Sequence, residues 1–156
     1  MDRVEHKRIL AIDLGSRRIG LAVSDALGIT AQGLPTLERR NKREDMFRLG
    51  KVLRQYEVAE IVLGNPLRMS GESGTASERS QEFAELLSEK FGLPVHLLDE
   101  RLTTAEAHRV LDAAEVPGRR RKEMVDELAA VLILQQWLAM RTVHHDGTES
   151  VREDVE

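Results

Sequence analysis

Three acidic residues stand where a carboxylate needs a partner. Asp13 follows the apolar run 9–12, Glu100 follows the largely apolar run 93–98, and Asp126 lies within a long helical pattern. A carboxylate next to a buried strand is costly to desolvate unless it meets a cation or a hydrogen-bond donor. If the three converge, they form an oxygen-ligand site suited to Mg²⁺ or Mn²⁺, and the chemistry typical of such a site on phosphodiesters is two-metal, in-line hydrolysis.

Each acid also has an ordinary structural explanation. Asp13 could cap the turn at Gly15, Glu100 could pair with Arg101, and Asp126 could be a first-turn acid favoured by the helix dipole. Any one of these explanations is reasonable on its own. Three acids at corresponding ends of core elements favour a shared site.

Asp99 is the alternative to Glu100 as the acid supplied by the last strand. Neighbouring residues of a strand point to opposite faces of the sheet, so one of the two can face Asp13. We favour Glu100, because it lies beyond the strand end and can reach further.

Basic residues form three clusters, although the formal net charge of the chain is −4. A solvated loop is the ordinary explanation of any one cluster, whereas three beside loops that could face one site give a modest indication of nucleic-acid binding. The chain has 1 Trp, 1 Tyr and 3 Phe, too few for a platform that stacks single-stranded bases, so a structured substrate is favoured. The three clusters are Arg17 with Arg18, Arg39 and Arg40 with Lys42 and Arg43, and the run 119–122. The residues expected to contact phosphates are Arg17, Arg18, Arg119, Arg120, Arg121 and Lys122.

Length and composition indicate one soluble domain. A chain of 156 residues can bury a full core but is short for two ordinary domains. It has no cysteine, which excludes disulfides and thiolate zinc sites, and no apolar stretch that resembles a signal peptide or a membrane span. We therefore expect a cytoplasmic protein with a folded domain over residues 1–141 and a disordered acidic tail over 142–156.

Hydrophobic periodicity predicts the elements that must position the acids. Antiparallel strands come first and helix crossovers later, which predicts an α/β fold with a mixed sheet and helices on its faces. Thr75 and Glu78 have the spacing of a capping box at the start of a helix. The expected strands are 9–12, 19–23, 29–37, 59–64 and 93–98, and the expected helices are 42–56, one from 75 onward, 104–114 and 123–140.

Four segments of the chain resemble, in order, the conserved blocks of the YqgF/RuvX family. They are IDLGSRRIGLAVSD, IVLGNPLRMSGESG, LLDERLTTAEA and VDELAAVLILQQWL, and together they span about Ile9 to Leu138. The resemblance implies an RNase H-like fold, a cytoplasmic bacterial protein, and a nuclease described either as processing the 5′ end of pre-16S rRNA or as a Holliday junction resolvase. The family's acidic residues correspond to Asp13, Glu100 and Asp126. Asn65 departs mildly from the pattern, since an apolar residue is commoner there.

The resemblance also implies a five-stranded sheet with the order 3-2-1-4-5. This order places the strand that ends near Gly64 between those of Asp13 and Glu100. Because glycine has no side chain, it would leave room for Glu100 to lean across toward Asp13.

Three functions compete on this basis. The first is a metal-dependent endonuclease acting on structured RNA, with branched DNA as the alternative substrate, working as a monomer or a homodimer. The second is a nucleotide-binding phosphotransferase or ATPase of the actin and sugar-kinase fold, which would need two such domains. The third is a non-catalytic RNA-binding module in which the acids are structural.

Overall fold

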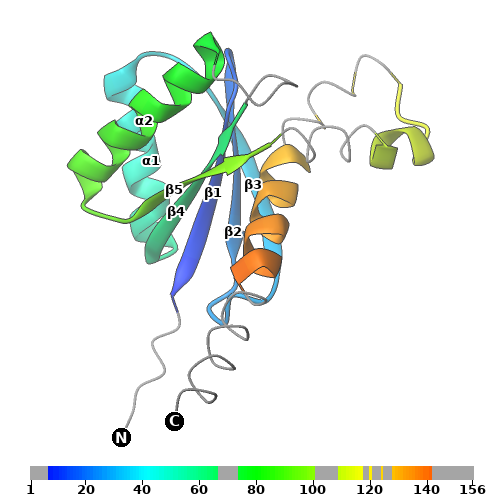
Figure 1. Cartoon of the computed structure of the whole chain (residues 1–156), viewed down its shortest axis with the longest axis horizontal. Coiled ribbons are helices and arrows are strands. Elements are labelled where there is room, and N and C mark those ends of the chain that lie inside the picture. Colours follow the sequence, from blue (N-terminus) through cyan, green and yellow to red (C-terminus); the bar gives the residue numbers. More distant parts are fainter. Residues whose placement is uncertain are drawn as a thin grey trace, which may run out of the picture.

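A five-stranded mixed sheet forms the centre of the fold, as a computed structural model shows (Figure 1). The structure describes residues 7–66, 74–100, 109–117, 120, 124 and 128–141. The strand order is β3-β2-β1-β4-β5, as the family resemblance implies, which confirms the predicted topology. The strands are β1 (Arg8–Leu14), β2 (Arg18–Ser24), β3 (Ala31–Glu38), β4 (Val58–Asn65) and β5 (Val95–Asp99).

The first three strands form an antiparallel meander, β4 pairs in parallel with β1, and β5 pairs in parallel with β4. Parallel pairing needs a crossover, and the helices α1 (Lys42–Gln55) and α2 (Thr75–Phe91) supply the two crossovers. The carboxyl ends of β1, β4 and β5 therefore meet at one edge of the sheet. Ligand and active sites of such sheets lie at this edge.

Helices cover both faces of the sheet, as predicted. Helices α1 and α2 lie on one face, and the helix over residues 128–141 lies on the other (Figure 1). Alternation along β1 divides its side chains between the two layers: Leu10 and Ile12 pack with α1 and α2, whereas Ile9 and Ala11 pack against helix 128–141. All four are at most 2% exposed, so β1 is the buried central strand that its apolar run predicts.

The capping of α2 differs from the sequence prediction, although the helix begins where it was expected. The helix begins at Thr75, its N-cap is Gly74, and no side chain caps it. The capping-box prediction at Thr75 and Glu78 is therefore wrong. The first turn is anchored differently, because the buried Ser77 donates a hydrogen bond from Oγ to the side-chain oxygen of Asn65 at the end of β4. This contact explains why a polar residue is suitable at position 65.

Several predictions concern residues beyond those described. These are the acidic tail over 142–156, the first part of the helix predicted over 104–114, and most of the first turn of the helix predicted over 123–140. The division into a domain over 1–141 and a tail stays a prediction. No helix among the described residues is long and apolar enough to cross a membrane.

Candidate active site

Asp13 and Glu100 approach each other at the carboxyl edge of the sheet. Asp13 is the sixth residue of β1 and is half-buried, and Glu100 directly follows β5. The Glu100 backbone N–H donates to the Asn65 carbonyl at 3.2 Å, which continues the pairing of β5 with β4 by one residue. The two carboxyl groups share a hydrogen bond.

Gly64 makes this approach possible. It is the penultimate residue of β4 and pairs with Leu98 of β5. The Glu100 carboxyl lies where a side chain at position 64 would project: a Cβ placed there would be 3.2 Å from Glu100 Cδ and 2.8 Å from Ile133 Cδ1. The Glu100 carboxyl therefore occupies the space that a side chain at position 64 would fill.

The face on which the acids meet follows from strand alternation. Asp13 points to the same face of the sheet as Ile9 and Ala11, which face helix 128–141. Glu100 comes two residues after Leu98, which packs in the same layer. Asp99 falls in the opposite register. The geometry thus brings Glu100 rather than Asp99 beside Asp13, while the charge of Asp99 is still felt at Glu100.

The electrostatics of the pair favour a cation. Burial, followed by the negative charge of Asp13 and the shared hydrogen bond, raises the pKa of Glu100 from 4.5 to about 8. A proton on Glu100 thus neutralises one of two carboxylates that would otherwise repel each other. Paired carboxylate oxygens are also the donors that Mg²⁺ and Mn²⁺ prefer, so the residues fit a divalent cation.

Asp126 lies outside the described residues, so the structure does not test whether it joins the pair. Among the residues that are described, no group of three or more metal-ligating side chains is found. The proposed site therefore rests on two acids observed together and on a third predicted from the sequence.

The predicted phosphate-contacting residues fall into two groups. Arg17 is exposed and Arg18 half-buried, and both lie at the turn between β1 and β2, close in sequence to Asp13. Arg120 is exposed. Arg119, Arg121 and Lys122 lie outside the described residues.

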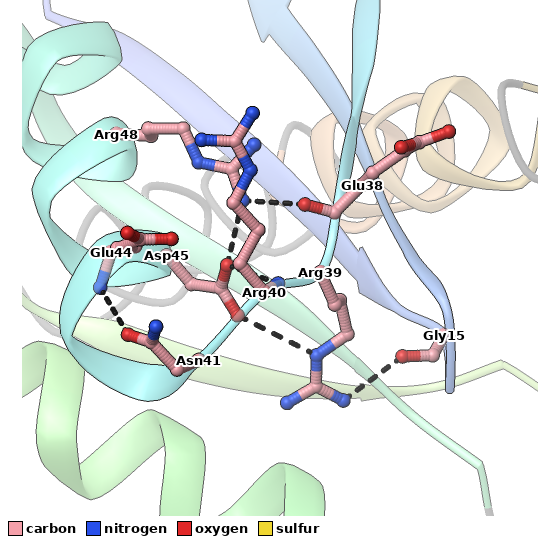
Figure 2. Close-up of polar contacts among 8 residues, drawn as sticks. All are labelled: Gly15, Glu38, Arg39, Arg40, Asn41, Glu44, Asp45 and Arg48. Atoms are coloured by element: carbon pink, nitrogen blue, oxygen red, sulfur yellow. Dashed lines mark hydrogen bonds and ion pairs between the residues drawn. The ribbon is translucent and has the colours of Figure 1, made fainter.

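The turn after Asp13 is held by a contact that the sequence analysis missed. Gly15 N–H donates to the Arg18 carbonyl at 2.9 Å, and a Cβ on Gly15 would be 2.7 Å from that carbonyl oxygen, which explains the glycine. Arg39 then donates from Nη1 to the Gly15 carbonyl at 3.1 Å (Figure 2). The sequence shows Arg39 only as part of a basic cluster, since the contact depends on β3 ending beside this turn.

The chain matches the family model described as "RuvX: Holliday junction resolvase" over residues 7–140. The chain belongs to the RuvX family. A RuvX relative from Koribacter versatilis, named "Putative pre-16S rRNA nuclease", is 55% identical over 141 residues, covering 90% of this chain and 92% of the relative. One from Moorella thermoacetica bears the same name and is 47% identical over 131 residues, covering 84% of this chain and 94% of its own.

Solved structures support the fold of this RuvX chain. Thermus thermophilus RuvC, solved in complex with a Holliday junction substrate, has a TM-score of 0.53 at 16% identity, covering 88% of this chain and 96% of RuvC. The fowlpox virus Holliday junction resolvase has a TM-score of 0.50 at 14% identity, covering 85% of this chain and 99% of that one. The predictions of the family, of an RNase H-like fold and of a hydrolase of the nuclease class are confirmed.

The raised pKa of Glu100 predicts how the stability of the metal-free protein depends on pH. The folded state holds a proton on Glu100 up to about pH 8, whereas the unfolded chain releases it near pH 4.5. The free energy of unfolding should therefore fall as the pH rises from about 5 to 8, and level off above, by at most about 5 kcal/mol. Urea unfolding in EDTA at a series of pH values measures this pH dependence of the free energy of unfolding. In Glu100→Gln this component of the slope should vanish, and an unchanged slope would contradict the coupling.

Proposed function

We propose that this RuvX-family chain is a divalent-metal-dependent endonuclease that hydrolyses phosphodiester bonds in structured RNA, at the 5′ end of pre-16S rRNA. The observation that carries the chemistry is the meeting of Asp13 and Glu100 over Gly64 at the carboxyl edge of the sheet. The names of the relatives at 55% and 47% identity support the RNA substrate.

Asp13, Glu100 and Asp126 would hold the metal. Bound Mg²⁺ or Mn²⁺ supplies Lewis-acid stabilisation of the phosphate and a low-pKa water. The backbone of Asp13 is fixed by the central strand and that of Glu100 by the continued pairing with Asn65, so both acids are placed before substrate arrives. Arg17 and Arg18, at the adjoining turn, would contact backbone phosphates that flank the cleaved bond.

A four-way DNA junction is the second candidate substrate. The description of the family model and the resolvases of the same fold favour it. A junction presents two equivalent strands, so its resolution calls for a symmetric dimer, whereas one protomer is sufficient to trim an RNA end.

Cleavage of the two substrates side by side tests the proposal. End-labelled precursor rRNA and a four-way DNA junction would be incubated with Mg²⁺, with Mn²⁺ or with EDTA, and the oligomeric state measured by light scattering. We expect metal-dependent cutting of the RNA. Cutting of the junction alone would favour the second candidate, and binding without cutting of either would favour a non-catalytic RNA-binding role.

Metal binding can be followed without activity. Mg²⁺ or Mn²⁺ should raise the melting temperature of the wild type at pH 8, because the cation relieves the repulsion between Asp13 and Glu100 and binds the folded state. Glu100→Gln should show a much smaller rise. Equal rises in both proteins would argue against Glu100 as a ligand.

A further inference from the structure

A buried carboxylate organises the corner of the molecule beside the turn that follows Asp13. Asp45, in the first turn of α1, is 1% exposed. It accepts hydrogen bonds from the Arg40 backbone N–H at 3.0 Å and from Arg48 Nη2 at 2.7 Å (Figure 2). Arg48 also donates to the Glu38 carbonyl, at the end of β3. These bonds fix Asp45 relative to both β3 and α1.

Arg39 is held between Asp45 and the turn. Its backbone N–H donates to the Arg17 carbonyl at 2.8 Å. Its Nη1 donates to the Gly15 carbonyl at 3.1 Å, and its Nε lies 3.8 Å from Asp45 Oδ2; Figure 2 draws both of these contacts. The guanidinium is thus oriented by contacts on two sides. It lies at the same edge of the sheet as Asp13, which belongs to β1 and comes two residues before Gly15 in the chain.

The guanidinium keeps donors for a ligand. It carries five N–H groups, its side chain is 26% exposed, and the second terminal nitrogen takes part in neither of the contacts drawn in Figure 2. The start of α1 offers fewer backbone N–H donors to an anion, because the N–H groups of Arg40 and Glu44 already donate to the side chains of Asp45 and Asn41. In this corner the anion-binding capacity therefore lies with Arg39 rather than with the helix terminus.

We propose that Arg39 binds a phosphate of the nucleic-acid strand beside the Asp13–Glu100 pair, and that Asp45 is the residue that positions it. This inference rests on the proposed function. A guanidinium can bind a phosphate through two parallel hydrogen bonds, and one that is already oriented loses little rotamer entropy on binding. It also offsets the repulsion that the acidic pair exerts on an approaching phosphate.

Binding without cleavage gives the test. The affinity of wild type, Arg39→Gln and Arg40→Gln for the precursor rRNA fragment and for the DNA junction would be measured in EDTA over a range of salt concentrations. Arg40→Gln is the matched control, because Arg40 is the next residue in the chain, its side chain is exposed, and its substitution removes the same single positive charge. We expect Arg39→Gln to weaken binding about 10-fold and to reduce the salt slope by about 1, with a change below about 2-fold in Arg40→Gln.

Two conservative variants separate charge from orientation. Arg39→Lys keeps the charge but cannot contact Gly15 and Asp45 as a planar fork, so we expect the salt slope of wild type with affinity only partly restored. Asp45→Asn keeps Arg39 but loosens it, so affinity should fall with the slope unchanged. If Arg39→Gln does not fold, the fall in affinity of Arg39→Lys relative to wild type still tests the contact, and wild-type affinity in Arg39→Lys would overturn the inference.

The outcomes distinguish this inference from the function on which it rests. If wild type binds the nucleic acid while the Arg39 and Arg40 variants lose affinity equally, Arg39 contributes only general charge and the inference is overturned. If wild type binds neither nucleic acid, the proposed function is overturned, and this inference with it.

Discussion

Asp13→Asn is expected to reduce RNA cleavage by at least about 1,000-fold, or about 4 kcal/mol of transition-state stabilisation. The amide keeps the shape of the side chain but removes the negative charge that would hold the metal. Because Asp13 lies near the end of the central strand and meets Glu100 directly, no neighbouring described acid that points to the same face can replace it. The measurement is the single-turnover rate with saturating Mg²⁺ or Mn²⁺.

Asp99→Asn is the control for this prediction. It makes the same chemical change one residue before Glu100, but in the register that faces the other side of the sheet. We expect it to reduce the rate by less than about 10-fold, since it acts on Glu100 only through its charge. Cleavage that survives Asp13→Asn, or that is lost equally in both variants, would contradict the assigned site.

Gly64→Ala should be nearly as damaging as the loss of an acid, although it adds only a methyl group. That methyl would overlap the Glu100 carboxyl and approach Ile133 Cδ1 to 2.8 Å. We expect a cost of about 1–3 kcal/mol in the free energy of unfolding and, because Glu100 is displaced from Asp13, a fall in cleavage of about 100-fold. Chemical denaturation and single-turnover cleavage measure the two effects.

Two comparisons identify the cause of the Gly64→Ala effect. Gly33→Ala, in the edge strand β3, places its methyl 3.3 Å from Val131 Cγ2 and away from the acids, so it should leave cleavage near the wild-type rate. In a Glu100→Gln background, Gly64→Ala should add little further loss of cleavage, because both changes act on the same carboxyl. Additive losses would mean that Gly64 acts elsewhere.

Local sequence patterns were sufficient to predict the five strands and the helices α1 and α2, and to show that only one of Asp99 and Glu100 can face Asp13. The alternation of Ile9, Leu10, Ala11 and Ile12 assigns side chains to two layers, and both layers are observed. The same alternation separates Asp99 from Glu100. These features follow from strand geometry, which depends on neighbours in the chain.

The remaining features depend on contacts between distant residues. Nothing in the sequence indicates that Asn65 would accept a hydrogen bond from Ser77, and the capping box expected at Thr75 and Glu78 is not formed. The contact of Arg39 with Gly15 requires β3 to pair with β2, because this pairing brings the residue after β3 beside the turn between β1 and β2. Such contacts are set by the tertiary arrangement, which hydrophobic periodicity does not encode.

The order of the strands along the chain also determines when the acidic pair can form during synthesis. Asp13 is made early, but Glu100 follows 87 residues later (100 − 13) and can lie over Gly64 only after β5 pairs with β4. At about 5–20 residues per second, this delay is roughly 4–17 s. Under the proposed function, a growing or truncated chain that ends before β5 would lack two of its three metal-binding acids, Glu100 and Asp126. Such a chain would leave the ribosome that makes it, and nearby RNA, uncut.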